Sequence, residues 1–233
     1  MTGTTPQLRR WHLYPTVEEL AQSAAGAISR CAEEAIKRRS AFHIILAGGK
    51  TPQHIYEHLT QMKNRWSGWH IYFGDERCLP ADHPDRNSVM ANLAWLDHVP
   101  IPRAQIHPIP TELGAEAAAE HYARVLKPVQ HVDMALLGLG ADGHTAGLMP
   151  GHDWGVEADA PAVLSITDAP PPYVERVSMS ARHLSKSRQV FFFVTGGNKA
   201  EAINRWRHND AIPVCAITPD GHVDIWVDET AWP

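Results

Sequence analysis

Two observations predict an α/β protein with a central, mainly parallel sheet flanked by helices. Short apolar runs recur along the 233-residue chain and are nearly continuous rather than alternating, as in strands that are covered on both faces. Stretches with apolar residues three or four positions apart lie between these runs, so strands and helices alternate. A chain of this length buries enough surface to be stable as one unit, and we expect a single domain over residues 1–233.

Six of the apolar runs are predicted as strands: 42–46, 69–73, 132–137, 189–194, 213–217 and 223–227. The last two runs are joined by Pro219-Asp220-Gly221, a combination that is typical of a tight turn. This arrangement predicts an antiparallel hairpin at an edge of the sheet.

Four longer stretches are predicted as helices: 16–39, 87–96, 112–126 and 198–207. The first begins with Thr16, whose hydroxyl can cap a helix, and Glu19 completes a capping box three residues later. The proline-rich segments 98–110 and 158–172 are expected to be extended connections or turns.

Composition excludes several classes of protein. There are 21 Lys and Arg against 26 Asp and Glu, and a net charge of -5 gives no electrostatic reason to expect nucleic acid. The three cysteines are scattered, which argues against a disulfide framework and suits a reducing compartment. No apolar run is long enough to span a membrane, and no secretory signal is visible. We therefore expect a soluble cytoplasmic protein without nucleic-acid or membrane partners; the sequence leaves its oligomeric state open.

The strongest chemical signal lies between Leu136 and Gly151, where an apolar strand leads into closely spaced glycines with Asp142 and His144 among them. Glycines at a strand end allow positive φ and let a ligand approach the backbone. An Asp two residues before a His can fix the tautomer of the ring. The alternative is a tight turn with a surface histidine. We reject dinucleotide binding, because Pro150 follows too soon for a crossover helix of ordinary length.

A second loop, with Gly48, Gly49, Lys50 and Thr51, follows the strand at 42–46 and leads into a helix at Gln53. Exposed amides at a helix N-terminus form a ready anion site, and we expect Thr51 to cap this helix. The Walker spacing is missing, so the loop is predicted to cradle phosphate without being a P-loop. The alternative is an ordinary strand-to-helix turn.

Two further loops follow predicted strands. Asp75, Glu76 and Arg77 come after the strand at 69–73, and Lys199 lies in a Gly-Gly turn after the strand at 189–194. A lysine in the first helical turn is poorly placed for the helix dipole unless an anion binds beside it. The alternatives are a solvated charged loop and a lysine that points to solvent. If the strands are parallel, all these loops meet at one edge of the sheet.

Metal and serine-nucleophile chemistry are poorly supported. The sequence has 15 histidines but neither H-E-x-x-H nor C-x-x-C, and it has no G-x-S-x-G. We expect no metal site.

These segments together resemble the 6-phosphogluconolactonase family, which belongs to a superfamily shared with glucosamine-6-phosphate deaminase/isomerase. The resemblance runs from about Thr16 to Trp226 and is carried by GLGADGHTAGLMPG at 138–151, FGDER at 73–77 and DRNSVM at 85–90. The family often has Ser where Arg86 stands, and usually Ser or Thr where Lys50 stands.

The resemblance implies a Rossmann-like domain that hydrolyses 6-phospho-D-glucono-1,5-lactone, in the oxidative pentose phosphate pathway, without a cofactor. It implies that His144 activates water, that Asp142 positions His144, and that Arg77 lies near the lactone or its developing oxyanion. It further implies substrate binding by a set that contributes amides, charges or hydrogen bonds: Gly48, Gly49, Lys50, Thr51, Asp75, Arg176 and Lys199.

Two alternatives remain. One is an amino-sugar-phosphate isomerase/deaminase, which resembles this chain but has an acid just before Pro-Gly, where Met149 stands here, and often Tyr where Arg77 stands. The other is a sugar-phosphate-binding protein without catalysis on the same fold.

Overall fold

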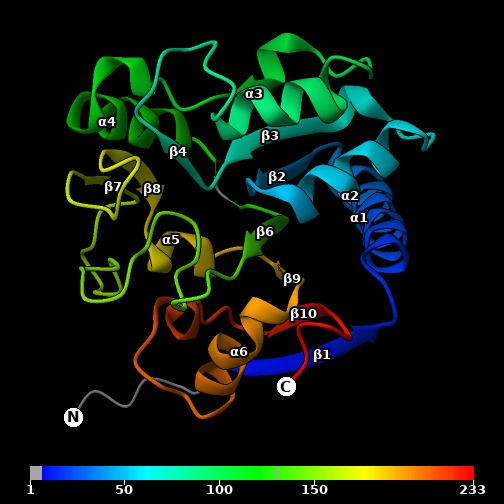
Figure 1. Ribbon diagram of the computed structural model, residues 1–233. Helices are drawn as coiled ribbons and strands as arrows, with labels where there is room; N and C mark the ends of the chain where they lie inside the picture. Colours follow the sequence, from blue (N-terminus) through cyan, green and yellow to red (C-terminus); the bar gives the residue numbers. More distant parts are fainter. Residues whose placement is uncertain (1–6, 130) are drawn as a thin grey trace.

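The main sheet is parallel throughout. The computed structural model describes residues 7–129 and 131–233, and within them seven strands form one sheet in the order β1-β10-β9-β6-β2-β3-β5, with every neighbouring pair parallel (Figure 1). Its strands are β1 (Leu8–Tyr14), β2 (Phe42–Leu46), β3 (Trp69–Phe73), β5 (Ile106–His107), β6 (Met134–Gly138), β9 (Gln189–Val194) and β10 (His222–Asp228). The predicted fold class is confirmed.

A smaller antiparallel sheet lies beside the main one. It has the order β4-β8-β7, and its strands are β4 (Asp75–Arg77), β8 (Arg176–Met179) and β7 (Val163–Ile166). Only Gly74 separates β3 from β4, and its amide donates to Leu46 O while its carbonyl accepts from Met179 N. The small sheet is therefore attached to the carboxyl end of the main sheet.

The helices are α1 (Val17–Arg39), α2 (Lys50–Thr60), α3 (Asn87–Ala91), α4 (Ala115–Leu126), α5 (Ala181–Ser185) and α6 (Ala200–Arg207). A helical turn at 92–96 extends α3 to the predicted end at Leu96, and short 3-10 turns precede α4 and α6. The Thr16 side chain accepts from Glu19 N at 3.1 Å, which confirms the predicted cap of α1. No helix among the described residues is long and apolar enough to cross a membrane.

Both faces of the main sheet are covered. On one face, Trp206 of α6 packs on Phe192 of β9, with ring centroids 4.8 Å apart. On the other face, which α1 covers, Trp226 of β10 packs on Phe191, with ring centroids 5.4 Å apart. Large rings buried on both sides explain why the strand sequences are nearly continuous in apolar residues.

The predicted antiparallel edge hairpin over 213–227 is wrong. Residues Pro213–Ala216 form a 3-10 turn, and β10 pairs in parallel with both β9 and β1. β10 is not an edge strand, because β1 lies outside it. Ile212, Val214 and Ile217 are buried without belonging to a strand; Ile212, for example, contacts Gly143.

The other predicted boundaries lie closer to those of the structure. The strands at 42–46, 69–73 and 189–194 have the predicted ends. The segment 158–172 is not wholly irregular, since it contains β7.

The order in which strands are added to the sheet reverses between β2 and β6, which are themselves parallel. From β2 it continues to β3 on one side, and from β6 it continues to β9 on the other. In an open α/β sheet, the loops that leave the strands at such a point diverge and leave a crevice where ligands bind. The two loops concerned contain Gly48–Thr51 and the glycine-rich segment 138–151.

Candidate active site

The loop after β6 places Asp142 against the ring of His144. The ring Nδ1 lies 2.7 Å from Asp142 Oδ1, and the same oxygen accepts from the His144 amide at 3.1 Å. Both side chains are partly exposed, with 37% of the His144 side chain and 47% of the Asp142 side chain accessible. A carboxylate on Nδ1 fixes the tautomer that leaves Nε2 as the acceptor, so this ring can take a proton from solvent.

Two glycines make this geometry feasible. A Cβ on Gly140 would lie 2.1 Å from His144 Nδ1, so only glycine lets the ring fold back over the loop. The Gly140 amide also donates to His144 O at 2.8 Å. Gly143 has φ of 95° and lies against Ile212, where a side chain would be both strained and obstructed.

Charges around Asp142 keep it ionised. Burial alone raises the pKa of this carboxyl, but the amide and ring of His144 outweigh burial and hold the pKa below its ordinary value. Arg205 donates to Asp142 O at 3.0 Å. Burial lowers the pKa of the Lys199 amine, and the charge of Asp142 opposes that effect. Lys199 therefore lies within electrostatic reach of the Asp142–His144 pair.

The loop after β2 presents backbone amides at the start of α2. Gly49 has φ of 105° and is the residue before the helix, which begins at Lys50. Thr51 does not cap this helix, because the helix already begins at Lys50; Thr51 Oγ1 instead lies 2.6 Å from Thr195 Oγ1. That contact joins this loop to the segment that carries Lys199. Lys50 is exposed.

β4 presents Asp75 and Arg77 on the same side, because side chains alternate along a strand. Arg176 on β8 lies opposite Arg77 in the ladder, and its Nη1 is 4.0 Å from Asp75 Oδ2. The Arg77 guanidinium donates to the Asp85 carbonyl and lies over the Tyr173 ring, 5.9 Å from its centroid. Burial lowers the pKa of Arg176, and Asp75 opposes this effect.

Direct contacts connect these loops one to the next. Ser178 on β8 pairs with Asp75 and accepts from the Gly147 amide at 3.0 Å, which ties the small sheet to the histidine loop. Asn87 donates to Asp75 Oδ1 at 3.1 Å and lies directly against Gly48. Together with the Thr51–Thr195 contact and the hydrogen bond from Arg205 on α6 to Asp142 O, these contacts form a closed circuit around the crevice.

Sequence reasoning missed four members of this circuit: Asn87, Ser178, Thr195 and Arg205. Asn87 lies in the segment 85–90 that carries the family resemblance, so its position could have been singled out. The other three act through tertiary contacts that have no local sequence signal. No group of three or more His, Cys, Asp or Glu within the described part of the chain is arranged to hold a metal ion.

The chain is similar to known proteins along almost all of its length. The family model described as "Glucosamine-6-phosphate isomerases/6-phosphogluconolactonase" matches residues 15–226. A protein from Synechocystis named 6-phosphogluconolactonase is 36% identical over 207 residues, which cover 83% of this chain and 84% of that protein. "Probable 6-phosphogluconolactonase 3, chloroplastic" from Oryza sativa subsp. indica is 34% identical over 236 residues, which cover 92% of this chain and 72% of that protein.

Solved structures have the same fold. The crystal structure of 6-phosphogluconolactonase from Thermotoga maritima matches with a TM-score of 0.87 at 25% identity, covering 95% of this chain and 100% of that one. A monomeric glucosamine-6-phosphate deaminase matches with a TM-score of 0.82 at 20% identity, covering 95% and 98%, which is a likeness of fold alone. With a family model that spans residues 15–226 and relatives of this similarity, the chain belongs to the glucosamine-6-phosphate isomerase/6-phosphogluconolactonase family.

Proposed function

We propose that this protein hydrolyses 6-phospho-D-glucono-1,5-lactone to 6-phospho-D-gluconate. The observation that carries this proposal is the Asp142–His144 pair, whose 2.7 Å contact leaves Nε2 free as a base in a partly exposed loop. The names of the relatives from Synechocystis and Oryza support the lactone as substrate. A lactone is an activated ester, so hydrolysis needs a base for water but does not need a covalent intermediate.

In this mechanism, His144 Nε2 accepts a proton from water as the water oxygen attacks the lactone carbonyl carbon. The carbonyl oxygen becomes an oxyanion, which Arg77 stabilises. The bond from this carbon to the ring oxygen then breaks, and the ring oxygen takes the proton from His144 and becomes a hydroxyl. Asp142 holds the ring in one tautomer and stabilises its transient positive charge. His144 thus returns to its starting state, and the carboxylic acid that has formed loses its proton to water, which gives 6-phosphogluconate and the acid that an assay can measure.

The phosphate of the substrate is assigned to the amides at Gly48–Thr51, with Lys199 and Arg176 supplying positive charge. Amides at the N-terminus of α2 favour an anion, and remote binding of this kind holds the ring in position for attack. Asp75 can accept hydrogen bonds from sugar hydroxyls. A general base contributes about 10²–10⁴ and an oxyanion donor about 10²–10³ in rate, which together correspond to roughly 5–9 kcal/mol of barrier.

The first test incubates freshly generated lactone with and without the protein and measures the acid that is released. The acid released by spontaneous ring opening is subtracted. Replacement of His144 with Ala should lower kcat by at least about 10²-fold, because the base is lost, while 6-phosphogluconate still binds. His121→Ala, on the exposed face of α4, is the matched control and should keep parental turnover. Near-parental turnover of His144→Ala would contradict the role of the base.

Two other outcomes decide between the alternatives. Robust ammonia release from glucosamine 6-phosphate would favour the deaminase, although Met149, at the position just before Pro-Gly, cannot titrate and is buried. Binding of 6-phosphogluconate by the parent protein without lactone turnover would favour a sugar-phosphate-binding protein.

We also infer a reducing compartment, with the cytoplasm as the proposed location, because Cys31, Cys78 and Cys215 are all free thiols. Cell fractionation checks this inference.

A further inference from the structure

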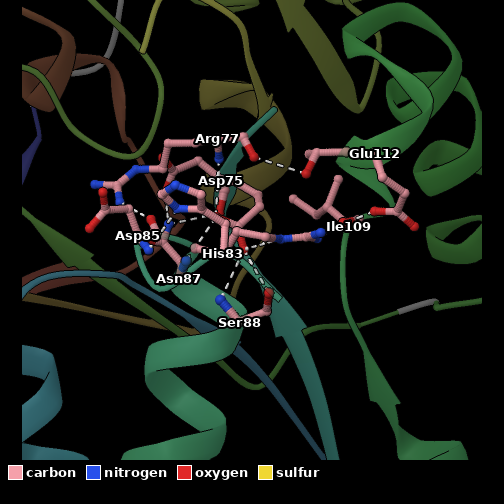
Figure 2. Close-up of polar contacts among 11 residues, drawn as sticks. Asp75, Arg77, His83, Asp85, Asn87, Ser88, Ile109 and Glu112 are labelled. Carbon is pink, nitrogen blue, oxygen red and sulfur yellow. Dashed lines mark hydrogen bonds and ion pairs between the residues drawn. The ribbon is translucent and has the colours of Figure 1, made fainter. Parts of the chain in front are cut away.

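Glu76 is a fully buried carboxylate between Asp75 and Arg77. Its Oε1 accepts from the amides of Arg77 at 3.0 Å and Asn87 at 2.7 Å. Its Oε2 accepts from the amide of Ser88 at 2.9 Å and from the Ser88 hydroxyl at 2.8 Å. Figure 2 labels three of the residues that bond to this carboxylate: Arg77, Asn87 and Ser88. One side chain thus joins β4 to α3 through three hydrogen bonds, from Asn87 and Ser88, while the fourth, from Arg77, lies within β4.

Arg86 supplies the opposite charge in the same interior. It is 3% exposed, and its Nε lies 3.6 Å from Glu76 Oε2. Nη1 donates to Glu112 Oε2 at 3.0 Å, and Nη2 donates to Ile109 O at 2.6 Å (Figure 2). A buried carboxylate is costly unless it is paired and hydrogen-bonded, and here both conditions are met.

The geometry connects this pair to the candidate active site. Side chains alternate along β4, so Glu76 points inward while Asp75 and Arg77 point to the opposite side. The same carboxylate holds the amide of Asn87, whose side chain donates to Asp75 O at 2.9 Å and Oδ1 at 3.1 Å and contacts Gly48. Any shift of Glu76 would therefore move groups on two sides of the crevice.

We propose that Glu76 and Arg86 are positioning residues: their buried ion pair fixes β4 against the start of α3, and thereby holds Asp75 and Arg77 at the substrate and Asn87 against the glycine loop. Neither side chain of the pair needs to touch the substrate. The inference rests on the proposed function for the roles of Asp75, Arg77 and the glycine loop.

The first experiment measures kcat and KM for lactone hydrolysis by Glu76→Gln. Glutamine keeps the size of the side chain, but its NH2 group faces an N–H donor and cannot accept from it. We expect kcat to fall at least tenfold and KM to rise, in protein that is folded by circular dichroism and assayed well below its Tm. The matched control is Glu33→Gln on the exposed side of α1, with kinetics within twofold of the parent.

The second experiment compares Arg86→Met and Arg86→Lys. Met keeps much of the length but removes the charge, whereas Lys keeps the charge and should recover part of the lost kcat/KM. Arg103→Met is the control, because Arg103 is 69% exposed and pairs only at the surface with Asp97. Equal losses in Met and Lys variants would show that charge is not what Arg86 contributes, and would overturn its role.

The pH profile adds a signature that packing alone would not give. Burial raises the pKa of Glu76, and its hydrogen bonds from Ser88 and Asn87 oppose burial. Removal of the Arg86 charge favours the protonated carboxyl further. The relative activity of Arg86→Met should therefore fall more at pH 6 than at pH 8, and the double variant Glu76→Gln/Arg86→Met should lose this added dependence.

The other charged or titratable groups around the Glu76–Arg86 pair remain in all these variants: Asp75 on β4, Cys78 after it, Glu112 before α4, Tyr122 on α4 and Arg176 on β8. They should affect parent and variants alike, so a pH dependence that the double variant retains would contradict the assignment to Glu76.

Two results separate this inference from the proposed function. If Glu76→Gln lowers Tm but keeps parental kcat and KM in folded protein, Glu76 is merely structural and the positioning role is wrong. If the parent protein shows no enzymatic lactone hydrolysis, the proposed function fails first, and that failure is visible without any variant of this pair.

Discussion

At the scale of single residues, the loop after β6 depends on a glycine as much as on its acid and base. His144 occupies the space that a side chain at position 140 would need. The contact between Nδ1 and Asp142 Oδ1 is thus set by backbone that passes underneath the ring. A side chain at position 140 would therefore disrupt the proposed catalytic pair without any change to Asp142 or His144.

We predict that Gly140→Ala lowers kcat for lactone hydrolysis by at least about 10²-fold, comparable to loss of the base itself. A Cβ at this position would lie 2.1 Å from His144 Nδ1 and 2.6 Å from Asp142 Oδ1, so the ring must move. Steady-state kinetics checks the prediction. Gly221→Ala, which meets nothing within 4 Å, is the control and should have parental kinetics. A Gly140→Ala enzyme with parental kcat would show that the ring position is unimportant.

Lys199→Ala should raise KM roughly 10–100-fold and change kcat less, because a hydrogen bond to a charged group contributes about 1.5–3 kcal/mol to binding. The expectation rests on its proposed contact with the phosphate. Initial rates over a range of lactone concentrations measure both constants. Lys63→Ala, an exposed residue beyond α2, should leave both unchanged. An unaltered KM for Lys199→Ala would remove Lys199 from the phosphate site.

At the scale of elements, α1 covers one face of the sheet and depends on a local cap. Thr16 accepts from Glu19 N, and the Thr16 hydroxyl also lies 3.3 Å from the Glu19 carboxylate. We predict that Thr16→Ala lowers the free energy of unfolding by about 0.5–2 kcal/mol without altering kcat or KM. Urea denaturation measures the loss, and Thr16→Ser should restore most of it because a hydroxyl can still cap. Equal stability of all three proteins would mean that the cap is dispensable.

The sequence predicts elements well where local pattern and burial agree. β2, β3 and β9 are nearly continuous apolar runs, as expected for strands in the interior of the sheet, and their ends were predicted correctly. β1 was missed because Arg9, Arg10 and His12 interrupt its apolar residues, so this edge strand has no continuous apolar run. The hairpin was wrong because a turn signal at 219–221 cannot tell whether the next strand pairs with its neighbour in sequence or, as here, with β9 and β1.

The same reasoning applies to the candidate site. Glycine and charge patterns after strands identified the loops, because the strand order of an α/β sheet brings such loops to one edge. The links between loops could not be predicted. Thr51 with Thr195 and Asn87 with Gly48 depend on side chains that meet only in the folded molecule.

At the scale of the whole molecule, three histidines line neighbouring strands of the sheet. The rings of His43 and His70 stack with centroids 4.6 Å apart, and His107 stacks on Tyr72 at 4.7 Å. Burial lowers the pKa of all three imidazoles, and the proximity of His70 lowers those of His43 and His107 further. The folded protein therefore resists protonation on this face.

Because these pKa values lie below those of the unfolded chain, the unfolded state binds more protons as the pH falls. The contribution of these three histidines to the free energy of unfolding should be fully present above about pH 6.5, the ordinary pKa of histidine. It should decrease as the pH falls below that value. Urea denaturation at pH 7.5 and pH 5.5 measures this loss. His70→Phe should reduce this loss by removing one half-buried ring that titrates, whereas His121→Phe on the exposed side of α4 should not. A His70→Phe protein with the parental loss would contradict the explanation.

The pairing of β1 with β10 has a consequence for biosynthesis. Arg10 and Asp224, which bond across these two strands, are 214 residues apart in the sequence. A ribosome makes β1 early, yet its hydrogen-bonding partner leaves the exit tunnel only after every other strand of this sheet has emerged. β1 must therefore stay unpaired until the other strands of this sheet have been made, so the sheet closes late, in one long-range step.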